Sequence, residues 1–184
     1  MREVGENAHV NAAPDDSHAP RTIPEATFSG DTGEAPDEVA SALAAYAAGQ
    51  MEYAEVLGVL QEARLLVPVV AVLGEVEYDA AGLAHDKTSD MATVLLTGRD
   101  GRTALLAFTG TAQLRAWNQE ARPVPVATRL AAQSAIQDGA DALVVDVAGP
   151  TTFAIQGDDL TGLAAGWRLG RVGRRSAWIR PPEE

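Results

Sequence analysis

Residues 91–117, MATVLLTGRDGRTALLAFTGTAQLRAW, decide the fold that we expect for this chain. Two apolar runs, 93–97 and 103–108, flank the pentapeptide Gly-Arg-Asp-Gly-Arg. An Asp-Gly pair between such runs is the strongest short-range signal for a tight β-hairpin, because both residues can adopt positive φ. The second run leads into Thr109-Gly110-Thr111, where a hydroxyl can cap a short helix over 112–117. The stretch therefore predicts a strand, a turn, a second strand and a capped helix.

Apolar patterns on both sides of this hairpin predict the elements that cover it. Helical spacing predicts two helices between residues 37 and 62, which together form a helical hairpin. Further extended segments are expected at 65–73, 122–126, 141–147 and 152–156. We predict a single α+β domain, in which a mixed, mostly antiparallel β-sheet of about five strands packs against the N-terminal helical hairpin and short helices.

The two ends of the chain differ in composition from its middle. Residues 1–36 contain four prolines, several acidic residues and almost no apolar periodicity, so we expect a disordered acidic tail. Within it, Ile23 and Phe28 could instead dock onto the domain as a strap. Residues 168–184 contain five arginines and are expected to form a basic flexible tail. The folded domain would then cover 37–167.

Composition excludes several classes of function. The chain has no cysteine, which rules out disulfides and cysteine nucleophiles and fits a reducing cytoplasm. Its formal charge of -12 disfavours binding to nucleic acid or to an anionic membrane, because both would repel it. No apolar run is long enough to span a bilayer, and the N-terminus has no signal-peptide pattern. We therefore expect a cytoplasmic protein.

A set of short motifs resembles a known family. The motifs are Ile23-Pro24-Glu25, the run 65–73 followed by Gly74-Glu75-Val76-Glu77, Lys87-Thr88-Ser89-Asp90-Met91-Ala92, the hairpin 97–101, Phe108-Thr109, Trp117, Pro123-Val124-Pro125 and Gly139-Ala140-Asp141-Ala142. Together they resemble the SseB-type N-terminal domain family, named after enhanced serine sensitivity protein B, in the branch found in actinobacteria. The resemblance implies a small α+β domain with no established catalytic residues.

The densest polar cluster of the chain comprises His85, Asp86, Lys87, Ser89 and Asp90. Lys87 and Ser89 could form a serine–lysine pair, and His85 with Asp86 could form a metal or base site. However, one-residue spacing in a loop supplies neither a positioned base nor oxyanion donors. The structural alternative is that Ser89 and Asp90 bond to backbone N–H groups at the entry to the next strand. If the cluster is functional, we expect it to anchor an anion or a partner's backbone.

Two features outside this cluster also need explanation. Trp178 and Ile179 form an apolar pair within the basic tail, which is typical of a short docking peptide. Asp146 interrupts the apolar run 141–147, and an isolated buried carboxylate is costly, so we expect it to be at a strand end or paired. The candidate partners are Arg99, Arg102, Arg115 and Arg129.

These observations favour a non-enzymatic interaction or regulatory module that binds a protein partner, with homo-oligomerisation left open. No cofactor is expected. A metal site is not expected either, because two of the three histidines lie in the N-terminal tail. The main alternative is a domain that binds a small, amino-acid-type molecule through the loop 74–90. A third hypothesis is a hydrolase that uses Ser89.

Overall fold

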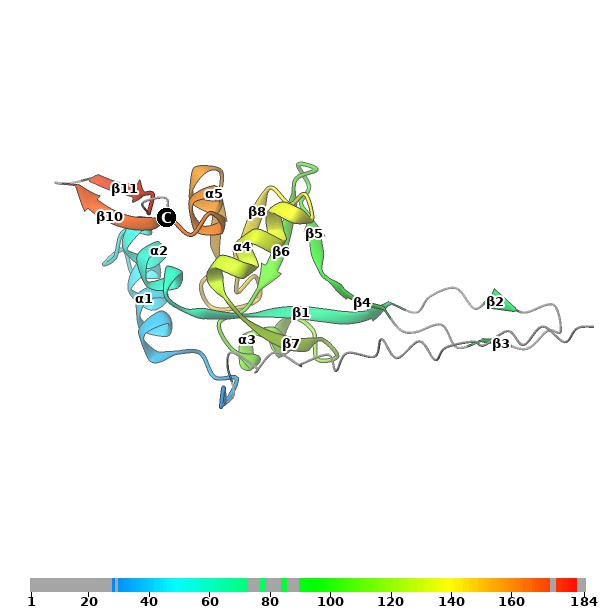
Figure 1. The fold of residues 1–184 in the computed structure, drawn as a ribbon. Helices are drawn as coiled ribbons and strands as arrows, with labels where there is room; N and C mark the ends of the chain where they lie inside the picture. The colour runs from blue at the N-terminus through cyan, green and yellow to red at the C-terminus, as the bar shows by residue number, and fades with distance from the viewer. Residues whose placement is uncertain are drawn as a thin grey trace, which may run out of the picture.

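The computed structural model describes residues 28, 30–72, 77–78, 84–85, 90–172 and 175–181. In this part of the chain five helices and eleven strands are formed (Figure 1). The helices are α1 (Asp37–Ala47), α2 (Tyr53–Gln61), α3 (Thr111–Trp117), α4 (Thr128–Gln137) and α5 (Asp158–Ala164). The strands are β1 (Arg64–Val72), β2 (Glu77–Tyr78), β3 (Ala84–His85), β4 (Asp90–Thr93), β5 (Leu95–Thr97), β6 (Thr103–Ala107), β7 (Arg122–Ala127), β8 (Ala142–Val145), β9 (Phe153–Gln156), β10 (Arg168–Val172) and β11 (Arg175–Ile179). The predicted α+β class is confirmed.

The predicted hairpin forms between β5 and β6, which pair antiparallel with Thr97 opposite Thr103. Its turn differs from the expected two-residue turn, because the Gly98 N–H donates to the Arg102 carbonyl at 2.8 Å and the Gly101 N–H donates to the Gly98 carbonyl at 3.0 Å. Gly101 has a φ of 81°. The connection is thus a three-residue loop that ends in a left-handed glycine, a common alternative in β-hairpins.

The main sheet has four strands in the order β5-β6-β8-β9. The two central strands, β6 and β8, are parallel, with Leu105 opposite Leu143, whereas β9 pairs antiparallel with β8. A parallel pair requires a crossover, and α3, β7 and α4 supply it. The carboxyl ends of β6 and β8 therefore lie side by side at one edge of the sheet.

A second sheet has the order β4-β1-β7 and contains three prolines in paired positions. The Leu66 N–H donates to the Phe108 carbonyl at 2.7 Å, on the side of β1 opposite to β7. Pro68 lies two residues after Leu66 in β1, so its nitrogen also points away from β7. Pro123 and Pro125 lie opposite Pro68 and Leu66. Their nitrogens therefore point away from β1, toward the outer edge of the sheet. None of the three residues therefore removes a hydrogen bond between β1 and β7.

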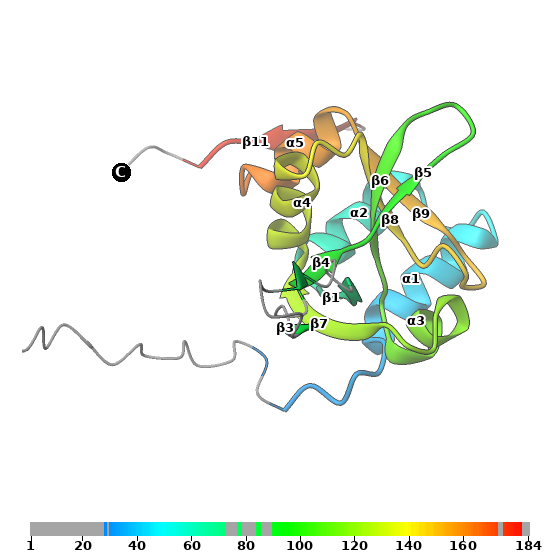
Figure 2. The same ribbon diagram turned by 90° about the vertical axis from the view of Figure 1, so that its right-hand side faces the viewer.

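The core lies on both faces of the main sheet. On one face Leu105, Leu143 and Ile155 are fully buried under α1, α2, α4 and α5. On the other face Leu106 packs with Leu66, Phe108 and Leu114 of α3 in a smaller cluster. Figure 2 shows α4 and α5 lying next to each other beside the sheet. Because successive side chains of β6 point to opposite faces of the sheet, Leu105 belongs to the first cluster and Leu106 to the second.

The N-terminal segment corrects one expectation. Residues 31–36 were expected to belong to a disordered tail, but the Thr111 N–H donates to the Gly33 carbonyl at 2.7 Å and Arg64 pairs with Asp31. Phe28 is half-buried, in keeping with the alternative that this segment docks onto the domain, whereas Ile23 lies outside the described residues. We refer to residues 31–36 as the strap. It is held because its polar groups complete the hydrogen bonds of a buried arginine.

The C-terminal segment corrects a second expectation. Instead of a basic flexible tail, β10 and β11 form an antiparallel hairpin in which Leu169 lies opposite Trp178. Both side chains pack against the main core, and Figure 1 shows the hairpin beside α2 and α5. The apolar residues Leu169 and Trp178 explain the difference, because their burial favours an ordered ribbon. None of the helices in the described part of the chain could span a lipid bilayer.

Candidate functional site

A cavity of about 320 Å³ lies at the edge where β6 and β8 end. Its lining residues come from α1, α3 and the segments that follow these two strands: Ala40, Leu43, Ala44, Ala47, Thr109, Gln113, Asp146, Pro150 and Thr151. Thr109 follows β6 and Asp146 follows β8 directly. In open α/β sheets, ligands bind outside the carboxyl ends of parallel strands. We refer to this site as the α1 cavity.

Asp146 is the most unusual residue of the α1 cavity. It is 2% exposed and adopts a φ of 54°, a left-handed conformation that aspartate tolerates better than most residues. The Thr109 N–H donates to Oδ1 at 2.8 Å and the Thr109 hydroxyl donates to Oδ2 at 2.7 Å. Burial raises the pKa of the Asp146 carboxyl, and the two Thr109 hydrogen bonds oppose this increase. The carboxylate is therefore held in place by neutral donors.

Of the two alternatives expected for Asp146, a strand end or an arginine partner, the structure shows the first, because Asp146 directly follows β8. None of Arg99, Arg102, Arg115 and Arg129 forms an ion pair with it; within the described chain the ion pairs are Arg64–Asp31 and Arg171–Glu55. Arg102 instead donates to the Gln156 side chain at 2.6 Å. The β6–β8 pairing explains this result, because it places the Thr109 donors beside Asp146.

Arg64 connects the strap to this site. The side chain of Arg64 is 8% exposed, its Nε donates to Asp31 Oδ2 at 2.5 Å, and its Nη2 donates to Asp31 Oδ1 at 2.7 Å and to the Glu34 carbonyl at 2.6 Å. Its Nη1 donates to the Thr109 carbonyl. The hydrogen bond from Arg64 holds the pKa of Asp31 below its usual value. A continuous polar chain thus joins Asp31, Arg64, Thr109 and Asp146.

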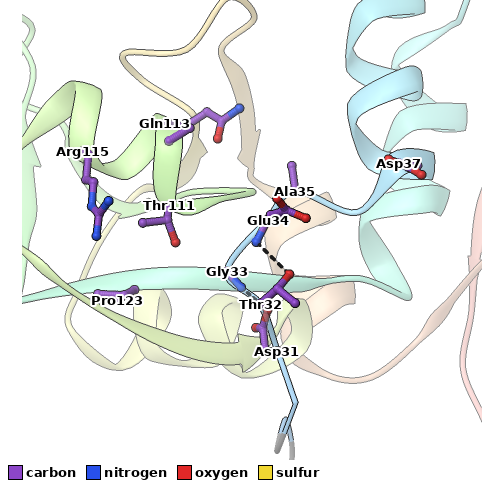
Figure 3. A pocket seen from close by; sticks show the side chains of 11 residues that line it. Asp31, Thr32, Gly33, Glu34, Ala35, Asp37, Thr111, Gln113, Arg115 and Pro123 are labelled. Carbon is purple, nitrogen blue, oxygen red and sulfur yellow. Dashed lines mark hydrogen bonds between the residues drawn. The ribbon is translucent and has the colours of Figure 1, made fainter.

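A second, more open cavity of about 810 Å³ borders the strap (Figure 3). Asp31, Glu34 and Asp37 lie along one side, and α3 supplies the other side with Gln113 and Arg115. Gln113 also lines the α1 cavity, so the two cavities are neighbours. Because Asp31 is paired with Arg64, the remaining charges are those of Glu34, Asp37 and Arg115, which leave this groove weakly acidic.

The polar cluster chosen from the sequence is only partly within the described residues. His85 lies in the short strand β3 opposite Glu77 of β2, and Asp90 begins β4 opposite Val72. Asp86, Lys87 and Ser89 lie outside the described residues, so the proposed pairs stay predictions. Among the described residues, no three histidine, aspartate or glutamate side chains gather where a metal ion could bind.

Trp178 and Ile179 have different surroundings. The Trp178 indole N–H donates to Asp159 Oδ1 at 2.8 Å, and its ring lies so close to Gly162 that a Cβ there would be 2.5 Å away. Trp178 therefore anchors β11 to α5, which corrects the expectation of a free docking peptide. Ile179 is 53% exposed.

Comparison with known proteins identifies the family of the chain. The model of the SseB protein N-terminal domain matches residues 39–161, about two thirds of the chain. The chain belongs to the SseB family. No curated protein and no solved structure gives a significant match.

The SseB match begins inside α1 and ends inside α5. It includes Arg64, Thr109 and Asp146, whereas the strap and the hairpin β10–β11 lie outside it. Sequence reasoning singled out Asp146 but missed the roles of Arg64 and Asp31. One signal for Arg64 was present, namely an arginine directly before an almost wholly apolar run.

Proposed function

We propose that this SseB-family protein is a non-catalytic protein-interaction module whose hairpin β10–β11 binds an acidic, partly apolar segment of a partner protein. The observation that carries the proposal is the pairing of an exposed Ile179 with Arg168 on the ribbon surface. Arg168 is also exposed. An apolar contact beside an arginine is suited to a segment in which acidic and apolar residues alternate.

The charge distribution supports an acidic partner. Residues 160–182 contain five arginines and no acidic residue, in a chain whose formal charge is -12. Arg171 is largely exposed, and its distance of 3.5 Å to Glu55 indicates a weak surface pair. The acidic remainder of the molecule would repel a long polyanion that extends beyond the hairpin, such as nucleic acid, whereas a short acidic protein segment can contact the hairpin alone.

The geometry of the hairpin supports a preformed platform. Leu169 and Trp178 lie opposite each other and pack on the core, so Arg168 and Ile179, one residue further along each strand, project from the other face. The hairpin is a two-stranded sheet in which each strand pairs only with the other among the described residues. Unpaired strand edges can accept an added strand from a peptide.

The non-catalytic part of the proposal rests on the one hydroxyl that donates to a buried carboxylate in the described residues, that of Thr109. The Thr109 N–H and hydroxyl both bond to Asp146, and the Thr109 carbonyl accepts from Arg64. These bonds suit a residue that joins structural elements. A hydrolase using Ser89, a cytoplasmic location, self-association and membership of the actinobacterial branch stay predictions.

The test uses a fluorescently labelled peptide of alternating glutamate and leucine, with a lysine–leucine peptide as the charge control. We expect the full chain to bind the acidic peptide by fluorescence anisotropy, with an affinity that falls as salt is added. The double variant Arg168→Glu, Ile179→Ser should weaken binding by about tenfold or more.

The matched control is the double variant Arg115→Glu, Leu130→Ser, which changes one arginine and one exposed leucine elsewhere. It should bind the acidic peptide as the unmodified chain does. Equal losses in both double variants, or equal binding of the two peptides, would refute a site on the hairpin. Circular dichroism melts verify that both variants are folded.

A further inference from the structure

The α1 cavity contains a buried carboxylate without a cationic partner among the described residues. Asp146 accepts one hydrogen bond on each oxygen, and Thr109 donates both of them. An ionised carboxylate offers about four acceptor sites, so further acceptor capacity remains. A buried carboxylate is ordinarily balanced by a cation, because the transfer of a lone charge from water is costly. The cavity that Asp146 lines is the place from which such a cation can approach.

The opposite wall of the cavity is apolar and made of small residues. Ala40, Ala44 and Ala47 recur at helical spacing along α1, line the cavity and are exposed. Leu43 and Pro150 extend this wall. The alanines leave space that larger side chains would fill. The volume of about 320 Å³ is at the small end of the range for ligand pockets, so it suits a short molecule.

We infer that the α1 cavity binds a small molecule with a primary ammonium group on a short apolar body. The ammonium group would donate to Asp146, and the apolar body would lie against the alanines of α1. Gln113 and Thr151 supply neutral hydrogen-bonding groups at the same cavity. An anion would be repelled by the carboxylate, and a neutral alcohol would gain a weaker hydrogen bond than a cation. This site is separate from the hairpin β10–β11.

The experiment titrates n-butylammonium into the full chain and follows amide chemical shifts by NMR, with n-butanol and butyrate as isosteric probes. We expect butylammonium to shift resonances of α1 and of the segment after β8, and to bind about tenfold or more tighter than either control. Failure of butylammonium to bind at millimolar concentration would overturn the inference, as would equal affinity for n-butanol.

Two variants locate the site. Asp146→Asn preserves the shape, tolerates the left-handed backbone and can still accept the Thr109 N–H bond, so it should stay folded yet lose about tenfold or more in butylammonium affinity. Ala44→Leu should abolish binding by filling the cavity, because Ala44 is an exposed helical position at its wall.

The matched control for the second variant is Ser41→Leu, an exposed α1 position that does not line the cavity. It should bind butylammonium normally, and so should the hairpin double variant Arg168→Glu, Ile179→Ser. Unchanged affinity in Asp146→Asn or in Ala44→Leu would place the ligand elsewhere and refute the inference. Failure of the hairpin proposal leaves these results unaffected, so the two can be judged separately.

Discussion

Asp31 and Asp146 stand at the two ends of one polar chain but have opposite environments. Arg64 donates two hydrogen bonds to Asp31, which lowers the pKa of that carboxyl. Asp146 is more deeply buried and has only neutral Thr109 donors, so burial raises its pKa. Their contributions to stability should therefore depend on pH in opposite directions.

The first prediction concerns Asp31. Replacing it with alanine leaves Arg64 buried without its carboxylate, so we expect Asp31→Ala to lower the free energy of unfolding by about 2–3 kcal/mol in urea denaturation. The contribution should be present above the usual pKa of 3.8 and be lost as the pH falls through the lower folded value.

The neighbouring variant Thr32→Ala is the control for this prediction. The Thr32 hydroxyl makes one long, exposed contact of 3.4 Å to the Glu34 N–H, so stability should change by less than about 0.5 kcal/mol. An Asp31→Ala variant as stable as the unmodified chain would show that the strap does not depend on this ion pair.

The second prediction concerns Asp146. Because its folded pKa lies above the ordinary value of 3.8, the folded state binds the proton more tightly than the unfolded state does. The stability linked to this proton is present below pH 3.8 and is lost as the pH rises through the folded pKa. Asp146→Asn has no such titration, so its stability relative to the unmodified chain should increase across this window. Parallel pH profiles from urea denaturation would contradict the prediction.

At the scale of single elements, the hairpin β5–β6 shows how far local sequence can specify structure. The Asp-Gly signal predicted the position of the turn and the pairing of its strands. It did not predict the turn type, because the same residues also fit a three-residue loop, where only Gly101 has a positive φ.

The third prediction follows from this turn. Gly101→Val should lower the free energy of unfolding by about 1–2 kcal/mol, because a β-branched residue is strained at a φ of 81°. A Cβ at this position meets no atom within 4 Å, so the cost is conformational and not a clash. Gly101→Asn should cost clearly less, since asparagine tolerates this region. Equal losses in thermal melts would contradict the explanation.

At the scale of the whole molecule, the hairpin β10–β11 extends the SseB domain core and presents basic groups. Leu169 and Trp178 pack beside α2 and α5. The Gln61 side chain also bonds to the Trp167 carbonyl at 3.0 Å and to the Leu169 N–H at 3.0 Å. The removal of residues 168–184 should therefore destabilise the domain, in contrast to the tail expected from composition.

The fourth prediction separates the anchor from the exposed face. Trp178→Ala should lower the free energy of unfolding by about 2 kcal/mol or more, because the ring packs on Gly162 and its N–H bonds to Asp159. Ile179→Ala should change it by less than about 0.5 kcal/mol, because Ile179 is 53% exposed. Differential scanning calorimetry of both variants checks this difference. Equal effects would mean that β11 is not anchored through its tryptophan.

The sequence by itself determined the features that depend on neighbours along the chain. The helices α1 and α2, the apolar strands β1 and β8 and the turn near Gly101 follow from periodicity and turn chemistry, which act over a few residues. The sequence also identified Asp146 as a carboxylate in an apolar run. These features were sufficient to predict the α+β class.

Only the tertiary structure decided which distant groups meet. Thr109 and Asp146 are 37 residues apart and come together because β6 and β8 pair in parallel. Asp31 and Arg64 are 33 residues apart and meet when the strap crosses the start of β1. Trp178 holds the arginine-rich C-terminal segment in place because its ring packs directly on Gly162 of α5, where there is no side chain in the way. Such contacts depend on the register and packing of whole elements, which no local pattern encodes.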